Sequence, residues 1–327
     1  MTVRWTPQDR RHGLKLRSAL RRLEVDALTV QATAALAREE VRAILLKGRA
    51  IADWLYDANE VRPYVDCDLL IDPAQLEVAG RALRGLGLQR LIDDTMLPAF
   101  AEPHAVTWGG QKGRASVDLH WRIPGIATDP KRAWRRLSAD TTPITLARGQ
   151  ADVLGEPARA LHLALHGIQN GREATKSIED LTRGLTRVSD AAWKAAASLA
   201  GELEAIEPFA AGLRLVPPGA ELADRLELPR TAGMRWALSA QTPPPGAMRM
   251  HEFAGARGLM AKLRYVATAL LPPPSYVRAL YPEARRSTWA LVAAYVRRPL
   301  AAVRAAPAAW RALRRARSRA QGSGSDT

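Results

Sequence analysis

The segment from Arg62 to Ile71, with the sequence RPYVDCDLLI, constrains the fold most, because it places two carboxylates in an otherwise apolar run. In a β-strand, residues i and i+2 project from the same face. Asp66 and Asp68 are therefore expected to point together, with Cys67 turned the other way into packing. Two neighbouring carboxylates repel each other, so the pair is costly unless a cation lies between them. Oxygen ligands of this kind suit Mg²⁺ or Mn²⁺. A lone D-x-D motif also has a simpler interpretation, which is a solvated strand end.

Composition narrows the class of protein. The chain has 327 residues, of which 47% are apolar, so we expect a globular protein with a sizeable core. A single cysteine excludes an intramolecular disulfide and favours a reducing compartment. The N-terminus is too polar for a secretory signal, and no apolar run is long enough to cross a membrane. We therefore expect a cytoplasmic protein, with peripheral membrane contact as an option. The net charge of +15 attracts anions in general, and it does not indicate whether the partner is a nucleotide, a nucleic acid or an acidic lipid.

Periodicity predicts an α+β protein with a mixed α/β-type sheet, followed by a helical region. The N-terminal stretch to Glu39 has near-helical apolar spacing, and GGQKG (109–113) separates two alternating segments, which is typical of a hairpin. The region 124–142 is expected to be a transition with one amphipathic piece at 134–137. The expected strands are 43–46, the D-x-D segment, 88–92, 104–108 and 114–121; the expected helices are 49–58, 74–86, 158–170, 178–188 and 191–209.

These elements predict four parts. Residues 1–39 form an N-terminal helix packed on the core, 40–155 the α/β core, 156–282 an α-helical region, and 283–327 a basic helical tail with a disordered end. From Ala284 to Ala320 there are ten arginines and no acidic residue. We expect a basic amphipathic helix, broken by Pro299, that packs up to about Val303 and adheres to anionic lipid or RNA through its last half. Truncation after Pro307 should then weaken binding to anionic liposomes or RNA at low salt and leave the nucleotide-induced thermal shift unchanged.

Three features in order are similar to the nucleotidyltransferase fold of the DNA polymerase β superfamily, and most of all to the bacterial family of uncharacterised nucleotidyltransferases. They are a strand that ends at Lys47-Gly48 and opens a helix, the Asp66/Asp68 pair, and Asp118 on a later strand. The resemblance covers most of the chain. Its further motifs are LLKG (45–48), VDLHW (117–121), a helix with His166, the segment 177–181, YVRALYP (276–282) and Arg297-Arg298-Pro299.

The resemblance implies metal-dependent transfer of a nucleoside monophosphate from an NTP to an acceptor hydroxyl, with release of pyrophosphate. Two metal ions held by three carboxylates can stabilise the entering and the leaving oxygen of an in-line displacement. Asp66 and Asp68 would bridge the metal ions, and Asp118 would hold the ion nearest the acceptor and help to deprotonate it. Gly48 would let the backbone approach the phosphates, while Lys47 and Arg49 would neutralise them.

Other candidates have a functional and a structural interpretation. Arg62 either contacts phosphate or pairs with an acid such as Asp66. His120 shares the expected face of Asp118 and lies near metal or substrate, or is a packed histidine. Lys176 is a candidate substrate cation or part of a solvated face, and Asp180 is a candidate substrate contact or a helix-packing partner.

Two rival functions remain open. A glycosyltransferase also uses D-x-D to hold a metal ion and a nucleotide sugar, although the Lys-Gly turn and the third carboxylate favour the nucleotidyltransferase. The second rival is a catalytically silent protein that binds RNA or a membrane. The presence of all three carboxylates argues against it, because inactive relatives of enzymes tend to lose them. Which NTP is used is open, and the acceptor is open among small molecules, sugars, peptides and RNA. Losing one carboxylate should relieve repulsion, so Asp66→Asn or Asp68→Asn should leave the fold intact or slightly stabilised.

Overall fold

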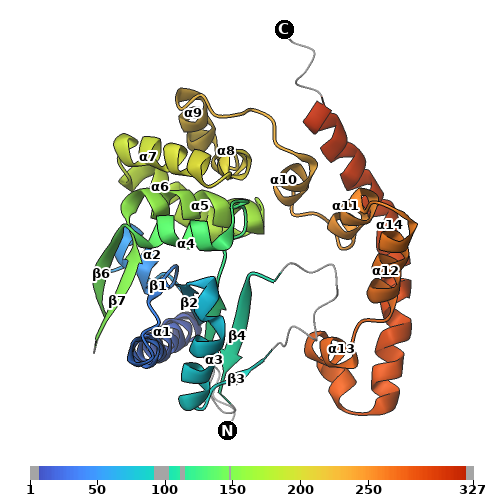
Figure 1. The fold of residues 1–327 in the computed structure, drawn as a ribbon, viewed down its shortest axis with the longest axis horizontal. Helices are drawn as coiled ribbons and strands as arrows, with labels where there is room; N and C mark the ends of the chain where they lie inside the picture. The colour runs from blue at the N-terminus through green and yellow to red at the C-terminus, as the bar shows by residue number, and fades with distance from the viewer. Residues whose placement is uncertain (1–6, 92–102, 111–114, 147–148, 322–327) are drawn as a thin grey trace. The chain divides into compact units, whose positions relative to one another are not determined.

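The computed structural model describes residues 7–91, 103–110, 115–146 and 149–321, and the chain divides into two compact units. The first comprises residues up to 91 together with 104–123 and 128–159, and the second comprises 124–127 and 160 onward. Figure 1 shows their elements. The residues of the GGQKG turn from 111 to 113 and the predicted disordered end from 322 lie outside the described residues.

The first unit is built on a mixed seven-stranded sheet in the order β3-β4-β5-β2-β1-β7-β6. β2 is central: it pairs antiparallel with β1 and parallel with β5. The strands are β1 (Ala43–Leu45), β2 (Asp66–Ile71), β3 (Gln89–Arg90), β4 (Ala105–Gly109), β5 (Ser116–His120), β6 (Thr141–Leu146) and β7 (Gly149–Leu154). The helices of this unit are α1 (Pro7–Arg38), α2 (Arg49–Leu55), α3 (Leu76–Gly85), which follows the 3₁₀ turn η1 (Pro73–Gln75), and α4 (Pro130–Ser138).

One face of the sheet is covered by α1 and α3 (Figure 1). Alternate residues of the strands meet the buried side of these helices in one apolar cluster, which includes Val25, Leu36, Cys67, Leu69, Leu83, Val117 and Leu119. As predicted, Cys67 points into this core and is fully buried. Because side chains alternate along a strand, Asp66, Asp68, Asp118 and His120 share the opposite face. The apolar alternation of β2 and β5 therefore places the carboxylates away from the core.

Several expectations for the first unit need correction. Among the apolar residues whose spacing predicted the first helix, Leu20 and Leu23 are exposed, and the buried stripe contains Val25, Ala32 and Leu36. The helix expected at 49–58 ends at Leu55. The transition expected over 124–142 contains the full helix α4 and the start of β6. The hairpin β6–β7 was not predicted at all.

The second unit is helical, as predicted. Its elements are α5 (Glu156–Asn170), whose first turn belongs to the first unit, α6 (Thr175–Arg187), α7 (Asp190–Glu202), α8 (Ile206–Leu213), α9 (Pro217–Arg225), α10 (Met234–Ser239), α11 (Ala247–Gly255), α12 (Leu259–Leu270), α13 (Pro274–Leu280), η3 (Pro282–Arg285) and α14 (Thr288–Gln321). Trp193 of α7 and Phe209 of α8 are buried against each other, with ring centroids 6.3 Å apart. The single segment expected at 191–209 is therefore two helices, separated at Glu204, which has a positive φ of 54°.

The C-terminal helix contradicts the expectation for the tail. α14 continues through Pro299 instead of breaking there. Its last half is packed, because Ala309, Leu313 and Ala316 are buried with residues of α10 and α11. Its first half is the exposed part, where Trp289 is 83% and Val303 70% exposed, although Leu291 and Ala294 on the other side are buried. The first half therefore packs on one side through Leu291 and Ala294, and the last half, which was predicted to be solvated, is packed as well.

Candidate active site

Two carboxylates meet on the open face of the sheet. Asp68 on β2 and Asp118 on β5 are directly paired residues of the parallel ladder, so their side chains project side by side. His120, two residues after Asp118, joins them: one ligand atom from each of the three lies within 4.8 Å of the others. Asp66 shares this face of β2 but is not part of the three-residue group, which contains His120 beside the two carboxylates.

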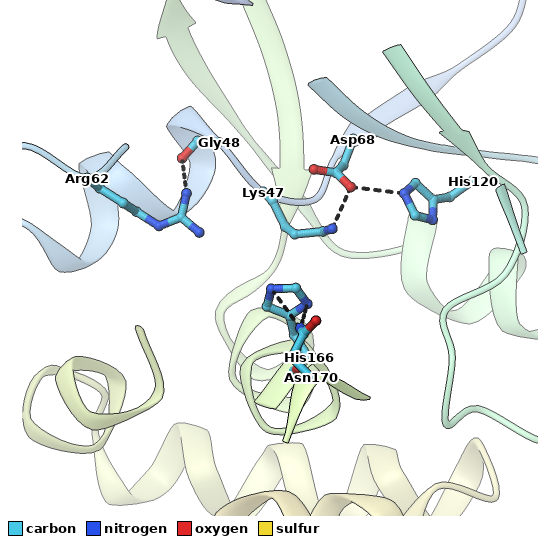
Figure 2. A network of polar contacts seen from close by, with 7 residues as sticks. All are labelled: Lys47, Gly48, Arg62, Asp68, His120, His166 and Asn170. Atoms are coloured by element: carbon cyan, nitrogen blue, oxygen red, sulfur yellow. Dashed lines mark hydrogen bonds and ion pairs between the residues drawn. The ribbon is translucent and has the colours of Figure 1, made fainter. Parts of the chain in front are cut away.

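Asp68 is held by two basic side chains, as Figure 2 shows. Its Oδ1 lies 2.5 Å from Lys47 Nζ and 3.0 Å from His120 Nε2. Asp68 is almost fully buried, and burial alone would raise the pKa of its carboxyl group. The hydrogen bond from His120 and the charge of Lys47 outweigh burial, so the pKa of Asp68 lies well below its usual range. Asp68 is therefore ionised at any physiological pH.

Asp118 is in the opposite electrostatic situation. Burial raises the pKa of Asp118 above its ordinary value, and the nearby charge of Asp68 adds to the shift, against a hydrogen bond with Thr107 that lowers it. Thr107 lies directly opposite Asp118 on β4. Two carboxylates on one face thus have pKa values moved in opposite directions, an arrangement that allows one to stay ionised while the other accepts a proton.

The donor set fits a divalent cation. Among the described residues, Asp118 Oδ1 and His120 Nδ1 are buried side-chain atoms without a hydrogen-bond partner. An unsatisfied buried acceptor is unfavourable, and a cation beside Asp118 would satisfy it. Carboxylate oxygens suit Mg²⁺ and Mn²⁺, and imidazole nitrogens are also common metal ligands in proteins. Asp68, Asp118 and His120 are the residues that could hold such an ion.

The turn between β1 and α2 brings Lys47 to this face. Leu46 donates its N–H to the carbonyl of Asp68, which aligns the end of β1 with the carboxylate strand. Gly48 then has φ 63° and ψ −120°, a backbone conformation that residues with a Cβ rarely adopt. Arg62 is only 1% exposed and donates a hydrogen bond from Nη1 to the carbonyl of Gly48 over 3.4 Å. The buried guanidinium thereby supports the turn that carries Lys47.

Arg49 is tied to carboxylates. Its Nε lies 2.6 Å from Asp53 Oδ1, and its Nη1 lies 3.6 Å from Asp26 Oδ2 on α1. Tyr64, which precedes β2, donates its hydroxyl to the other oxygen of Asp26 over 2.7 Å. This network of Asp26, Arg49 and Tyr64 joins α1 to both segments that flank the carboxylates. The charge of Arg49 is therefore shared with two acids, Asp26 and Asp53.

The remaining candidates belong to the second unit. Lys176 and Asp180 lie on α6, where Lys176 is exposed and Asp180 is completely buried. His166 lies on α5, with its Nδ1 3.1 Å from Asn170 Nδ2 (Figure 2). Sequence reasoning missed Thr107 and the network of Asp26, Arg49 and Tyr64. The register of the predicted hairpin, which pairs Gly109 with Ser116, would have placed Thr107 opposite Asp118.

With this geometry in view, comparison with known proteins is informative. A family model described as "Uncharacterised nucleotidyltransferase" matches residues 14–217. The chain belongs to this uncharacterised nucleotidyltransferase family. The match contains the whole sheet and both carboxylates, so the predicted family and transferase class are confirmed.

No curated protein matches the chain. Among solved structures, the chain is similar to the antibiotic-resistance factor ANT(2'')-Ia, whose solution structure has a TM-score of 0.37 and 14% identity. That comparison covers 54% of this chain and 91% of the other. The predicted mixed sheet with a helical C-terminal region is likewise confirmed.

Proposed function

We propose that this member of the nucleotidyltransferase family transfers a nucleoside monophosphate from an NTP to an acceptor hydroxyl. The observation that carries the proposal is the pair Asp68 and Asp118, which lie opposite each other on adjacent strands beside the Lys47-Gly48 turn. The acceptor oxygen attacks the α-phosphorus, and the bond from that phosphorus to the bridging oxygen breaks. Pyrophosphate leaves with the electron pair of that bond.

The opposite pKa shifts of Asp68 and Asp118 suggest different roles for the two carboxylates. Asp68, whose pKa is lowered, remains an anionic ligand throughout, whereas Asp118, whose pKa is raised, is the stronger base and accepts the proton of the acceptor hydroxyl. A divalent cation, Mg²⁺ or Mn²⁺, held by Asp68, Asp118 and His120 would supply charge stabilisation at the phosphates. Asp66, on the same face of β2, is proposed as a further metal ligand.

Lys47 and the turn around it are proposed to bind the triphosphate. The ammonium of Lys47 already lies at Asp68 and is 20% exposed, so it can reach an incoming phosphate. Gly48 brings the backbone close, with Arg62 as a positioning residue through the Gly48 carbonyl. Arg49 makes a smaller contribution, because its charge is shared with Asp26 and Asp53. Lys176 stays a predicted substrate contact, whereas the complete burial of Asp180 favours its structural alternative, a helix-packing partner.

The reaction class is tested by where a label goes. The protein is incubated with Mg²⁺ or Mn²⁺, a cell extract and each NTP, labelled in parallel at the α- and at the γ-phosphate. Nucleotidyl transfer moves the α-label into a product and releases the γ-label as pyrophosphate. Transfer of the γ-label would show a kinase, and transfer of sugar from a sugar-labelled nucleotide would show the glycosyltransferase; either result, or no transfer from any NTP, contradicts the proposal.

A further inference from the structure

The helix α12 has an apolar stripe that no part of the described structure covers. Leu259, Leu263, Val266 and Leu270 recur with helical spacing and therefore form one stripe along the helix. They are 72%, 53%, 40% and 49% exposed, and no residue of α12 is buried. An amphipathic helix of a globular protein normally turns such a stripe toward the core. On α12 the stripe faces solvent.

A second stripe runs along the first half of α14. It consists of Trp289, Val292, Val296, Leu300 and Val303, which again recur with helical spacing and are all between 46% and 83% exposed. The two helices are joined near the end of α12, where Tyr295 donates its hydroxyl to Pro272 O and Arg298 Nη2 donates to Ala269 O. Both stripes thus belong to one region of the second unit, which we call the α12–α14 surface.

Basic side chains flank both stripes. Residues 256–305 contain nine lysines and arginines, and Glu283 is their single acidic residue. Successive residues of a helix are about 100° apart, so Arg297 and Arg304 lie beside the stripe of Val296 and Val303. An apolar face bordered by lysine and arginine is the pattern of a helix that lies in the interface of a membrane.

We propose that the α12–α14 surface binds the interface of an anionic lipid bilayer. The positive charge of the α12–α14 surface favours an anionic bilayer over a second copy of the chain. Two copies would place one strongly basic surface against another, which like-charge repulsion opposes. Proteins that bind single-stranded RNA combine a basic groove with aromatic rings on which the bases stack, whereas these stripes are aliphatic apart from Trp289. No described helix is long and apolar enough to cross a membrane, so the binding is interfacial.

The proposal is independent of the proposed reaction, since the surface lies beyond residue 217, where the family match ends. Flotation of the full-length protein tests it, with phosphatidylcholine vesicles that contain or lack phosphatidylglycerol. Leu263→Gln and Leu300→Gln remove one residue from each stripe, and each should weaken flotation about tenfold through lost apolar burial. Leu20→Gln on α1 is the matched control, because Leu20 is 54% exposed and Leu300 53%.

A second pair of variants tests the charge. Arg297→Glu with Arg304→Glu should weaken binding to the anionic vesicles, and should do so more than Arg311→Glu with Arg314→Glu, which makes the same charge change on the last half of α14. Binding should also fall as salt is added. Circular dichroism checks that every variant is folded.

Four results would overturn the proposal. They are no flotation of the wild type, equal flotation on phosphatidylcholine alone, stripe variants that float like Leu20→Gln, and arginine pairs with equal effects. Light scattering and RNA-binding measurements address the other occupants. A dimer, or an RNA complex, that the wild type forms and Leu300→Gln loses while vesicle binding persists would assign the surface to that partner instead.

Discussion

Removing the charge of Asp68 should destabilise the metal-free protein, whereas removing the charge of Asp118 should stabilise it. The sequence alone suggested that losing a carboxylate from the D-x-D pair relieves repulsion. The structure reverses this for Asp68, because Lys47 and His120 both bond to it and lower its pKa. At Asp118 the loss of a charge should be favourable, because burial and the charge of Asp68 raise its pKa.

The size of the effect at Asp68 follows from its contacts. Breaking a buried ion pair by removing one partner costs roughly 3–5 kcal/mol. The side chain of Asp68 is 2% exposed, but that of Lys47 is 20% exposed and can turn toward water. We therefore expect Asp68→Asn to lower the free energy of unfolding by about 2–4 kcal/mol, which corresponds to a fall in Tm of roughly 5–15 °C.

Thermal unfolding followed by circular dichroism near neutral pH, with EDTA present, measures this. Asp152→Asn is the matched control: Asp152 pairs with Arg42 at 3.2 Å, but both side chains are at least one-third exposed. An exposed pair of this kind should cost less than about 1 kcal/mol. If Asp68→Asn melts at or above the wild-type Tm, or if Asp118→Asn melts below it, the electrostatic account of the carboxylate face is wrong.

Three further changes have defined outcomes. Gly48→Ala should cost roughly 1–3 kcal/mol in backbone strain and lower NTP affinity. Gly85→Ala, at a helical position with free space, should leave the affinity unchanged and the Tm unchanged or slightly higher. Burial raises the pKa of Asp26, so its contribution to stability is complete below the unfolded-state pKa and is lost as pH rises through the folded-state pKa. The Tm of Asp26→Asn should therefore gain on the wild type as pH rises above the unfolded-state pKa of about 4, and a constant difference would refute this. Truncation after Pro307 should expose α10 and α11 to proteolysis, because it removes the buried residues of the last half of α14; resistance equal to wild type would contradict that packing.

The sheet's centre could be predicted because its signals are local. β1 and β2 are short apolar runs, and the hairpin β4–β5 has a glycine-rich turn between alternating segments. β6 and β7 were missed because their pairing is not local. β7 joins the sheet beside β1, where Ile44 pairs with Asp152. β6 is a largely exposed edge strand that contains Pro143, which by itself argues against a strand.

The site was predictable to the same extent. Spacing alone placed Asp66 and Asp68 on one face, and a strand pattern put Asp118 on another strand. That Asp118 lies opposite Asp68 depends on the parallel pairing of β2 with β5, which no local pattern gives. The prediction for the C-terminal tail was partly wrong for a related reason. The large apolar residues of the first half were taken to mark the only packed part, but α10 and α11 also bury Ala309, Leu313 and Ala316 of the last half.

The most direct test of the account is single-turnover transfer of the α-label by wild type and by Asp118→Asn. The two are compared with Asp152→Asn, which changes a carboxylate in the same sheet away from the pair. We predict that Asp118→Asn still binds the NTP but transfers at least about 100-fold more slowly, since it loses its general base. Asp152→Asn should transfer at the wild-type rate. Transfer by Asp118→Asn at the wild-type rate would contradict the assignment of the reaction to this carboxylate pair.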